Sequence, residues 1–127
     1  MGSAKPLKPN INIHVNIEIV HYRIEFFSPA VQDGVLNWPA GIAASFAAIA
    51  TRMVDHGPNL GMPYTKAMGQ GLFEIRARGV EGIGRAFFCT QVGQRIVILH
   101  SFIKKTQATP AHELRIARKR LKEVNDD

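Results

Sequence analysis

The chain contains a single cysteine, Cys89, so it can form no internal disulfide, and its composition suits a reducing cytosol. Cys89 lies in an apolar segment, where a buried structural thiol is the common case and a nucleophile is rare. No apolar run approaches the ~20 residues that a membrane span needs. The first residues also lack the charged stretch and apolar segment of a secretion signal. We therefore expect a cytoplasmic protein with no membrane contact.

The motifs of several common enzyme chemistries are missing as well. The five histidines are scattered and form no i, i+4 pair of the kind that holds zinc on a helix, so we expect no metal and no cofactor. Gly69–Gly71 and Gly82–Gly84 do not lie between a strand and a helix, as a phosphate-binding loop requires, and we interpret both as turns. No Gly-x-Ser-x-Gly sequence is present, which argues against a serine hydrolase.

Positive charge is what the chain has in excess. Lysine and arginine number 16 against 10 aspartates and glutamates, which gives a formal net charge of +6. With 127 residues, 46% of them hydrophobic, the chain is long enough for one domain over residues 1–127 with its own core. Small basic domains often bind nucleic acid, an acidic protein or an anionic surface, and the charge alone does not choose among these partners.

The first half of the chain predicts strand followed by two helices. Residues 11–19 alternate between apolar and polar side chains, and residues 22–27 continue this strand pattern. Ser28-Pro29 is a typical helix start for a short helix that ends near Leu36. A second helix follows Asn37-Trp38-Pro39 and ends at Gly57-Pro58, and one face of it carries Ile42, Phe46, Ile49 and Met53. We expect the two helices to form a hairpin on one sheet face, with Trp38 packed at its corner.

Three consecutive strands are predicted in the second half, after a loop over residues 59–70. Residues 72–78 alternate, which places Phe73, Ile75 and Ala77 on one face and Leu72, Glu74, Arg76 and Arg78 on the other. Residues 85–90 and 95–100 are rich in aromatic and β-branched side chains, and short glycine-containing turns connect the three segments. Short connections favour antiparallel neighbours, so we predict a three-stranded meander.

A C-terminal helix completes the predicted fold. Thr109-Pro110 repeats the pattern of an N-cap followed by proline, and the helix has an apolar stripe of Leu114, Ala117, Leu121 and Val124. The order β-α-α-β-β-β-α predicts an α+β fold, a small antiparallel sheet with the N-terminal helical hairpin packed on one face and a C-terminal helix.

Charged residues gather on the predicted strands and open two interpretations. The polar sheet face would present Glu74, Arg76, Arg78, Arg85, His100, Lys104 and Lys105 as an open surface. Two or three fixed cations beside a proton acceptor suit a phosphodiester, but Glu74 could equally neutralise Arg76 or Arg85 in cross-strand ion pairs. The basic side of the last helix, with Arg115, Arg118 and Lys119, fits a solvated face, a nucleic-acid contact or an acidic partner.

Several of these segments resemble the HigB-like toxins, in their phage-derived branch, of the RelE/ParE superfamily. The resemblance covers about residues 21–124, with residues 1–20 as an N-terminal extension or extra strand, and it is carried by residues 71–76, 84–88 and 98–110 together with Glu113 and Ala117. It implies a compact α+β toxin that cleaves messenger RNA on the ribosome without a metal. It also implies a partner antitoxin, often a helix-turn-helix, HigA-like protein that carries the complex to operator DNA. ParE-type relatives instead inhibit DNA gyrase, and a non-catalytic basic nucleic-acid-binding module is a third possibility.

The resemblance also implies roles for individual residues. Arg85 matches the strand arginine of the superfamily and would bind phosphate, while Arg76 matches the arginine of the preceding strand, in either a catalytic or a structural role. Lys104 and Lys105 would bind phosphate or stabilise the transition state, and the proton transfers would fall to His100 or Glu74, a choice that stays open. The expected RNA-binding residues are Arg78, Tyr64, Lys66, Arg115, Arg118 and Lys119. From the net charge of +6 we further expect that an acidic antitoxin surface covers either the cationic sheet face or the basic C-terminal helix.

Overall fold

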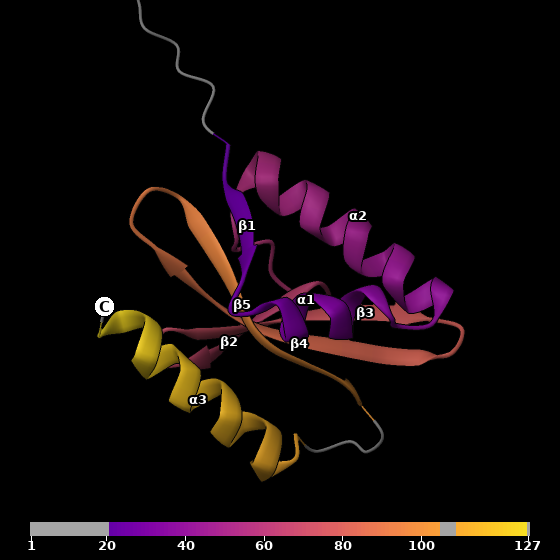
Figure 1. Cartoon of the computed structure of the whole chain (residues 1–127). Coiled ribbons are helices and arrows are strands. Elements are labelled where there is room, and N and C mark those ends of the chain that lie inside the picture. The colour runs from indigo at the N-terminus through magenta and orange to yellow at the C-terminus, as the bar shows by residue number, and fades with distance from the viewer. Residues whose placement is uncertain (1–20, 105–108, 127) are drawn as a thin grey trace, which may run out of the picture.

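The computed structural model describes residues 21–104 and 109–126, and within them three helices pack on a five-stranded sheet. The predicted strand over residues 11–19 lies outside the described residues. The elements follow the order β1 (Arg23–Phe26), α1 (Pro29–Leu36), α2 (Ala40–His56), β2 (Thr65–Gly69), β3 (Leu72–Gly79), β4 (Gly82–Gln91), β5 (Arg95–Lys104) and α3 (Ala111–Asn125). Figure 1 shows α1 and α2 on one side of the sheet and α3 on the other, which confirms the predicted α+β class.

The sheet has the strand order β1-β5-β4-β3-β2, and the predicted meander of β3, β4 and β5 is confirmed. Two details differ from the prediction. The segment 59–70 is not all loop, because Thr65–Gly69 forms the edge strand β2 against β3. The sheet is also not wholly antiparallel, because β1 pairs with β5 in parallel. The five residues of β2 are too few for the side-chain period to distinguish them from loop, and the four residues of β1, although predicted as strand, are too few to fix their partner.

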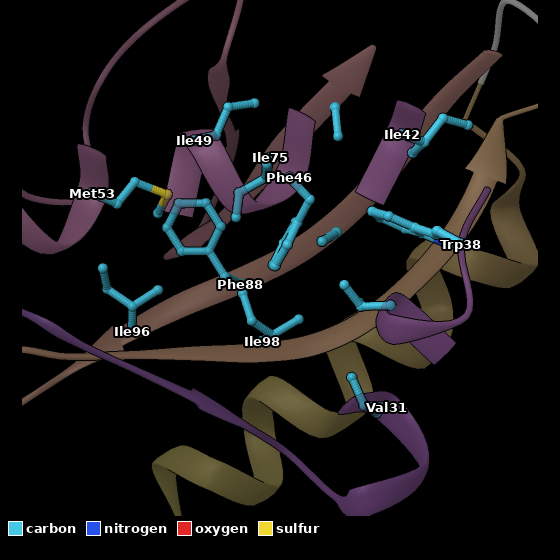
Figure 2. Close-up of a cluster of buried hydrophobic side chains, with 13 residues drawn as sticks. Val31, Trp38, Ile42, Phe46, Ile49, Met53, Ile75, Phe88, Ile96 and Ile98 are labelled. Carbon is cyan, nitrogen blue, oxygen red and sulfur yellow. The ribbon is translucent and has the colours of Figure 1, made fainter. Parts of the chain in front are cut away.

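The first two helices begin and end where the sequence predicts. Ser28 Oγ accepts a hydrogen bond from the backbone N–H of Val31 at 3.2 Å, and Pro29 is the first residue of α1. The apolar face of α2 packs against β3, β4 and β5 in the core shown in Figure 2. Trp38 is buried at the corner between the helices, with its ring 5.8 Å from that of Phe46 in an edge-to-face arrangement. This confirms the packing role expected for Trp38.

Helix α3 covers the opposite sheet face with its apolar stripe. Ala117 and Leu121 pack on the buried side chains Leu72, Phe87, Cys89, Val97 and Leu99. Cys89 is 1% exposed and burial raises the pKa of its thiol, so the core role is confirmed. Thr109 is not the N-cap, because the helix begins one residue later than predicted and the carbonyl of Pro110 accepts from the N–H groups of Glu113 and Leu114.

None of the three described helices is long and apolar enough by itself to cross a membrane. Helices α1 and α2 satisfy the length and composition only when they are taken together, and the chain bends by 119° between them.

The start of α2 is capped by a residue from a distant turn. Pro39 at the N-cap offers no side-chain acceptor, so the first N–H groups of the helix need another partner. Glu81, in the turn between β3 and β4, supplies it: its Oε2 accepts from the N–H of Gly41 at 3.0 Å. This hydrogen bond to Gly41 is the main reason that the pKa of Glu81 lies below its usual value. A carboxylate at this position also interacts favourably with the helix dipole.

We expect Glu81→Ala to lower the midpoint of thermal unfolding at neutral pH. A carboxyl group with a lowered pKa in the folded state adds stability above its unfolded pKa and loses it as the pH falls through the folded value. The gap between variant and wild type should therefore close below pH 4.5, the ordinary value for glutamate. Glu123→Ala, at an exposed position on α3, is the matched control. A gap that persists at low pH would show that Glu81 does not act through its charge.

Candidate functional site

The strand register brings the predicted cations together on one sheet face. Arg76 lies opposite Arg85, and Ile83 lies opposite both Arg78 and Lys104. Residues directly opposite each other in an antiparallel pair point to the same side of the sheet. Lys66 of β2 joins them through its pairing with Glu74. We call this surface the cationic face and define it as Lys66, Arg76, Arg78, Arg85 and Lys104.

A buried ion pair lies at the centre of the cationic face. Glu74 is 0% exposed and Arg85 is 3% exposed, and both Nε and Nη2 of Arg85 donate to Glu74 Oε2, the former at 2.8 Å. Arg76 Nη1 lies 3.6 Å from the other carboxylate oxygen, Oε1, which has no hydrogen-bond partner within the described part of the chain. The ion-pair interpretation of Glu74 is thus confirmed for both arginines: the pair with Arg85 joins β3 to β4, and the pair with Arg76 lies along β3.

The expectation of an open surface is wrong for Glu74 and Arg85. Aromatic side chains enclose the pair: the guanidinium carbon of Arg85 lies 5.8 Å from the ring centre of Phe87 and 5.6 Å from that of Phe102. The alternation of β3 and β4 gives the side to which these residues point, but not what lies over them. Lys66 and Arg78 are exposed as expected, and Arg76 and Lys104 are half-buried.

The remaining cations crowd around this pair. The pKa of Lys104 lies below its usual value, chiefly because of partial desolvation and then because of the charges of Arg85, Arg76 and Lys66, which Glu74 only partly offsets. The single carboxylate of Glu74 therefore neutralises only part of the positive charge around it. Such a cluster is electrostatically unfavourable when empty and favourable once an anion binds to it.

We expect Lys104→Gln to raise the midpoint of thermal unfolding slightly at neutral pH and low salt. A lysine whose pKa is lowered by folding destabilises the fold while it is charged, so removing the charge relieves repulsion. The gain should vanish in high salt, which screens exposed charges. It should also vanish as the pH rises through the folded pKa of Lys104, since the wild-type lysine is then neutral. A variant less stable than wild type at neutral pH would contradict the repulsion.

His100 is held next to this cluster by a residue of α3. The ring atom Nε2 of His100 lies 2.6 Å from Oε1 of Glu113, and both side chains are partly exposed, 15% and 24%. The His100 ring also stacks on Phe102 at 6.1 Å between centres. The contact with Glu113 was not predictable from the sequence, because the segment between the two residues carries no periodic pattern that would place them side by side.

A family model for phage-derived protein Gp49-like (DUF891) matches residues 33–122, from within α1 to near the end of α3. The chain belongs to the Gp49-like family. No curated protein matches it. The matched part of the Gp49-like chain includes the whole cationic face together with Glu74, His100 and Glu113.

The other predicted RNA-binding residues of the Gp49-like chain lie in several places. The guanidinium carbon of Arg52 lies over the Tyr64 ring, 4.6 Å from the ring centre. Arg118 donates to the carbonyl oxygens of Gly69 and Met68 at 2.8 and 3.0 Å, so it ties α3 to the end of β2. Arg115 and Lys119 are exposed on α3, and Lys105 lies outside the described residues. Contact of these residues with RNA stays a prediction.

Over residues 21–104 and 109–126 no group of three or more His, Cys, Asp and Glu side chains is arranged to hold a metal ion. The groups that the site does present are fixed cations, the buried carboxylate of Glu74, and the partly exposed His100 with its partner Glu113.

Proposed function

We propose that this Gp49-like protein is the toxin of a type II toxin–antitoxin system and that it cleaves messenger RNA on the ribosome, as a HigB-like enzyme. The Gp49-like family is related to RelE-like toxins, which makes a toxin the leading hypothesis. The observation that carries the proposal is the cationic face, where Lys66, Arg76 and Lys104 gather around the buried Glu74–Arg85 pair. A phosphodiester is the anion that such a surface suits.

The proposed reaction begins with attack by a ribose 2′-hydroxyl on the adjacent phosphorus. The new P–O2′ bond gives a 2′,3′-cyclic phosphate, the P–O5′ bond breaks, and the hydroxyl proton is lost while the leaving 5′-oxygen gains one. Charge accumulates on the phosphorane oxygens, where fixed cations stabilise the transition state more than the ground state. Lys104 and Arg76 are the cations near the centre of the face that reach its surface.

The exposure of Arg85, Glu74 and His100 indicates the role of each in the proposed reaction. Arg85, the expected phosphate ligand, is 3% exposed and bound to Glu74, so we assign it a positioning role beneath the phosphate. Glu74 is fully buried and serves as the counter-charge that fixes Arg85 and Arg76. We assign the role of transferring protons to His100, because its side chain is partly exposed and Glu113 holds its ring in place.

The partner expected for this toxin is an acidic antitoxin surface that covers the cationic face and neutralises it. The net charge of +6 supports this choice, since complementary charges steer association. Reversing the charge of Arg78 and Lys66 together should weaken antitoxin binding and make the loss depend on salt.

Controlled expression in bacteria tests the proposal. We expect growth arrest with loss of intact message, unchanged DNA supercoiling, and rescue by a helix-turn-helix gene adjacent to this one. Arrest with a DNA-damage response and intact message would instead assign the gyrase inhibition of ParE-type toxins. Normal growth at high expression would exclude the toxin hypothesis and favour a basic nucleic-acid-binding module.

A further inference from the structure

A cavity of about 320 Å³ lies at the edge of β3, next to the cationic face. Its lining comes from α2, from the segment before β2, and from β3 and β4, and includes Ser45, Met62, Tyr64, Arg76, Arg78 and Ile83. The proposed cleavage chemistry uses Arg76 from this lining but none of the apolar walls. A volume of this size falls at the lower end of the range for small-molecule sites.

The cavity and the cationic face share residues. Arg76 lines the cavity and also lies 3.6 Å from the Glu74 carboxylate. Ile83 lines it and pairs across the sheet with Lys104. A strand of nucleic acid with a phosphate on Lys104 and Arg76 would therefore place its neighbouring nucleoside at the mouth of the cavity.

The chemistry of the lining suits a flat, partly apolar group attached to an anion. Met62, Tyr64 and Ile83 supply apolar surface, Arg76 and Arg78 supply positive charge, and no carboxylate is among the described lining residues. The Arg52 guanidinium lies over the Tyr64 ring and helps to hold it. Proteins that read single-stranded RNA splay bases out and stack them on aromatic rings and arginine planes.

We propose that this cavity seats one unstacked nucleobase of the RNA strand whose phosphate lies on the cationic face. The inference rests on the proposed function and deepens it, because it adds a base-binding site to the phosphate site. The selectivity of the enzyme for its cleavage position would arise partly here, through Ser45, Tyr64 and Met62, and not on the cationic face alone.

The test compares two single-stranded RNAs of about ten nucleotides by fluorescence anisotropy, one intact and one with abasic residues throughout. Stacking of one base is worth roughly a five- to hundredfold gain in affinity, so wild type should prefer the intact strand by at least about fivefold. Ser45→Trp fills the cavity and should remove this preference while the affinity for the abasic strand stays unchanged. Ala44→Trp, at the exposed neighbouring position, is the matched control and should behave as wild type.

A second variant protects the test against misfolding of Ser45→Trp. Met62 is 60% exposed, so Met62→Ala should fold normally and still reduce the preference for the intact strand. An unchanged preference in both Ser45→Trp and Met62→Ala, or no preference in wild type with tight binding of the abasic strand, would overturn the base site and leave the phosphate site standing. Failure of wild type to bind either strand would count against the proposed function itself.

Discussion

Replacing Glu74 with leucine is expected to lower the free energy of unfolding by about 3–5 kcal/mol, the typical cost of leaving one member of a buried ion pair alone. Arg85 is 3% exposed and its Nε and Nη2 atoms both donate to Glu74 Oε2, so the variant would bury an uncompensated guanidinium. Urea unfolding measures this change through the transition midpoint, with the slope of the transition unchanged if the compactness of both states is unchanged.

Two controls separate burial from the mere loss of an ion pair. The double variant Glu74→Leu/Arg85→Met should recover most of the stability, because apolar replacement of a buried pair is often neutral or favourable. Glu25 and Arg95 form a second cross-strand ion pair at 2.8 Å, but both side chains are more than a third exposed, Glu25 at 35% and Arg95 at 39%. Glu25→Leu should therefore cost less than about 1 kcal/mol. Equal costs for Glu74→Leu and Glu25→Leu would contradict the importance of burial.

Variants of the buried Glu74–Arg85 pair are poor tests of catalysis. Arg85→Ala would leave Glu74 buried without its main partner, so an inactive Arg85 variant would not distinguish loss of chemistry from loss of fold. The half-buried Lys104 is the better position for a functional test, since its replacement removes charge repulsion and does not break a buried pair.

Lys104→Gln is expected to slow message cleavage by about 10²–10³-fold, the usual effect of removing one group that stabilises transition-state charge. The rate of message loss in a translating extract measures it. Lys122→Gln is the matched control, because it removes the same charge from an exposed position on α3, where Lys122 pairs with Asp126. Similar losses in the two variants would mean that net charge, and not the position of Lys104, determines activity.

Local pattern predicted most of the fold. The alternation in β3, the helix start at Ser28-Pro29 and the apolar spacing along α2 each depend on neighbours within a few residues, and the structure has all three elements in place. The edge strand β2 was not predicted, because Thr65–Gly69 has almost no apolar alternation and is held by backbone pairing with β3. The parallel pairing of β1 depends on the path of the whole chain and not on its four residues.

Which strand residues share the face of the candidate site was predictable from the sequence, but how deeply they are buried was not. Strand alternation placed Glu74, Arg76 and Arg85 on one face, and the structure brings them together. Part of the cover over the Glu74–Arg85 pair is Phe102, which lies on β5 and was not predictable from the patterns of β3 and β4. The contact of His100 with Glu113, and the cavity, join elements that are distant in the sequence and leave no periodic signal.

Mapping message ends by primer extension, after adding the purified protein to a translating extract, tests ribosome-dependent cleavage most directly. We expect cuts at codon-phased positions that appear only with ribosomes, persist in Lys122→Gln and are lost in Lys104→Gln. Intact message at a dose that stops translation would contradict it, and the cationic face would then serve a target other than RNA.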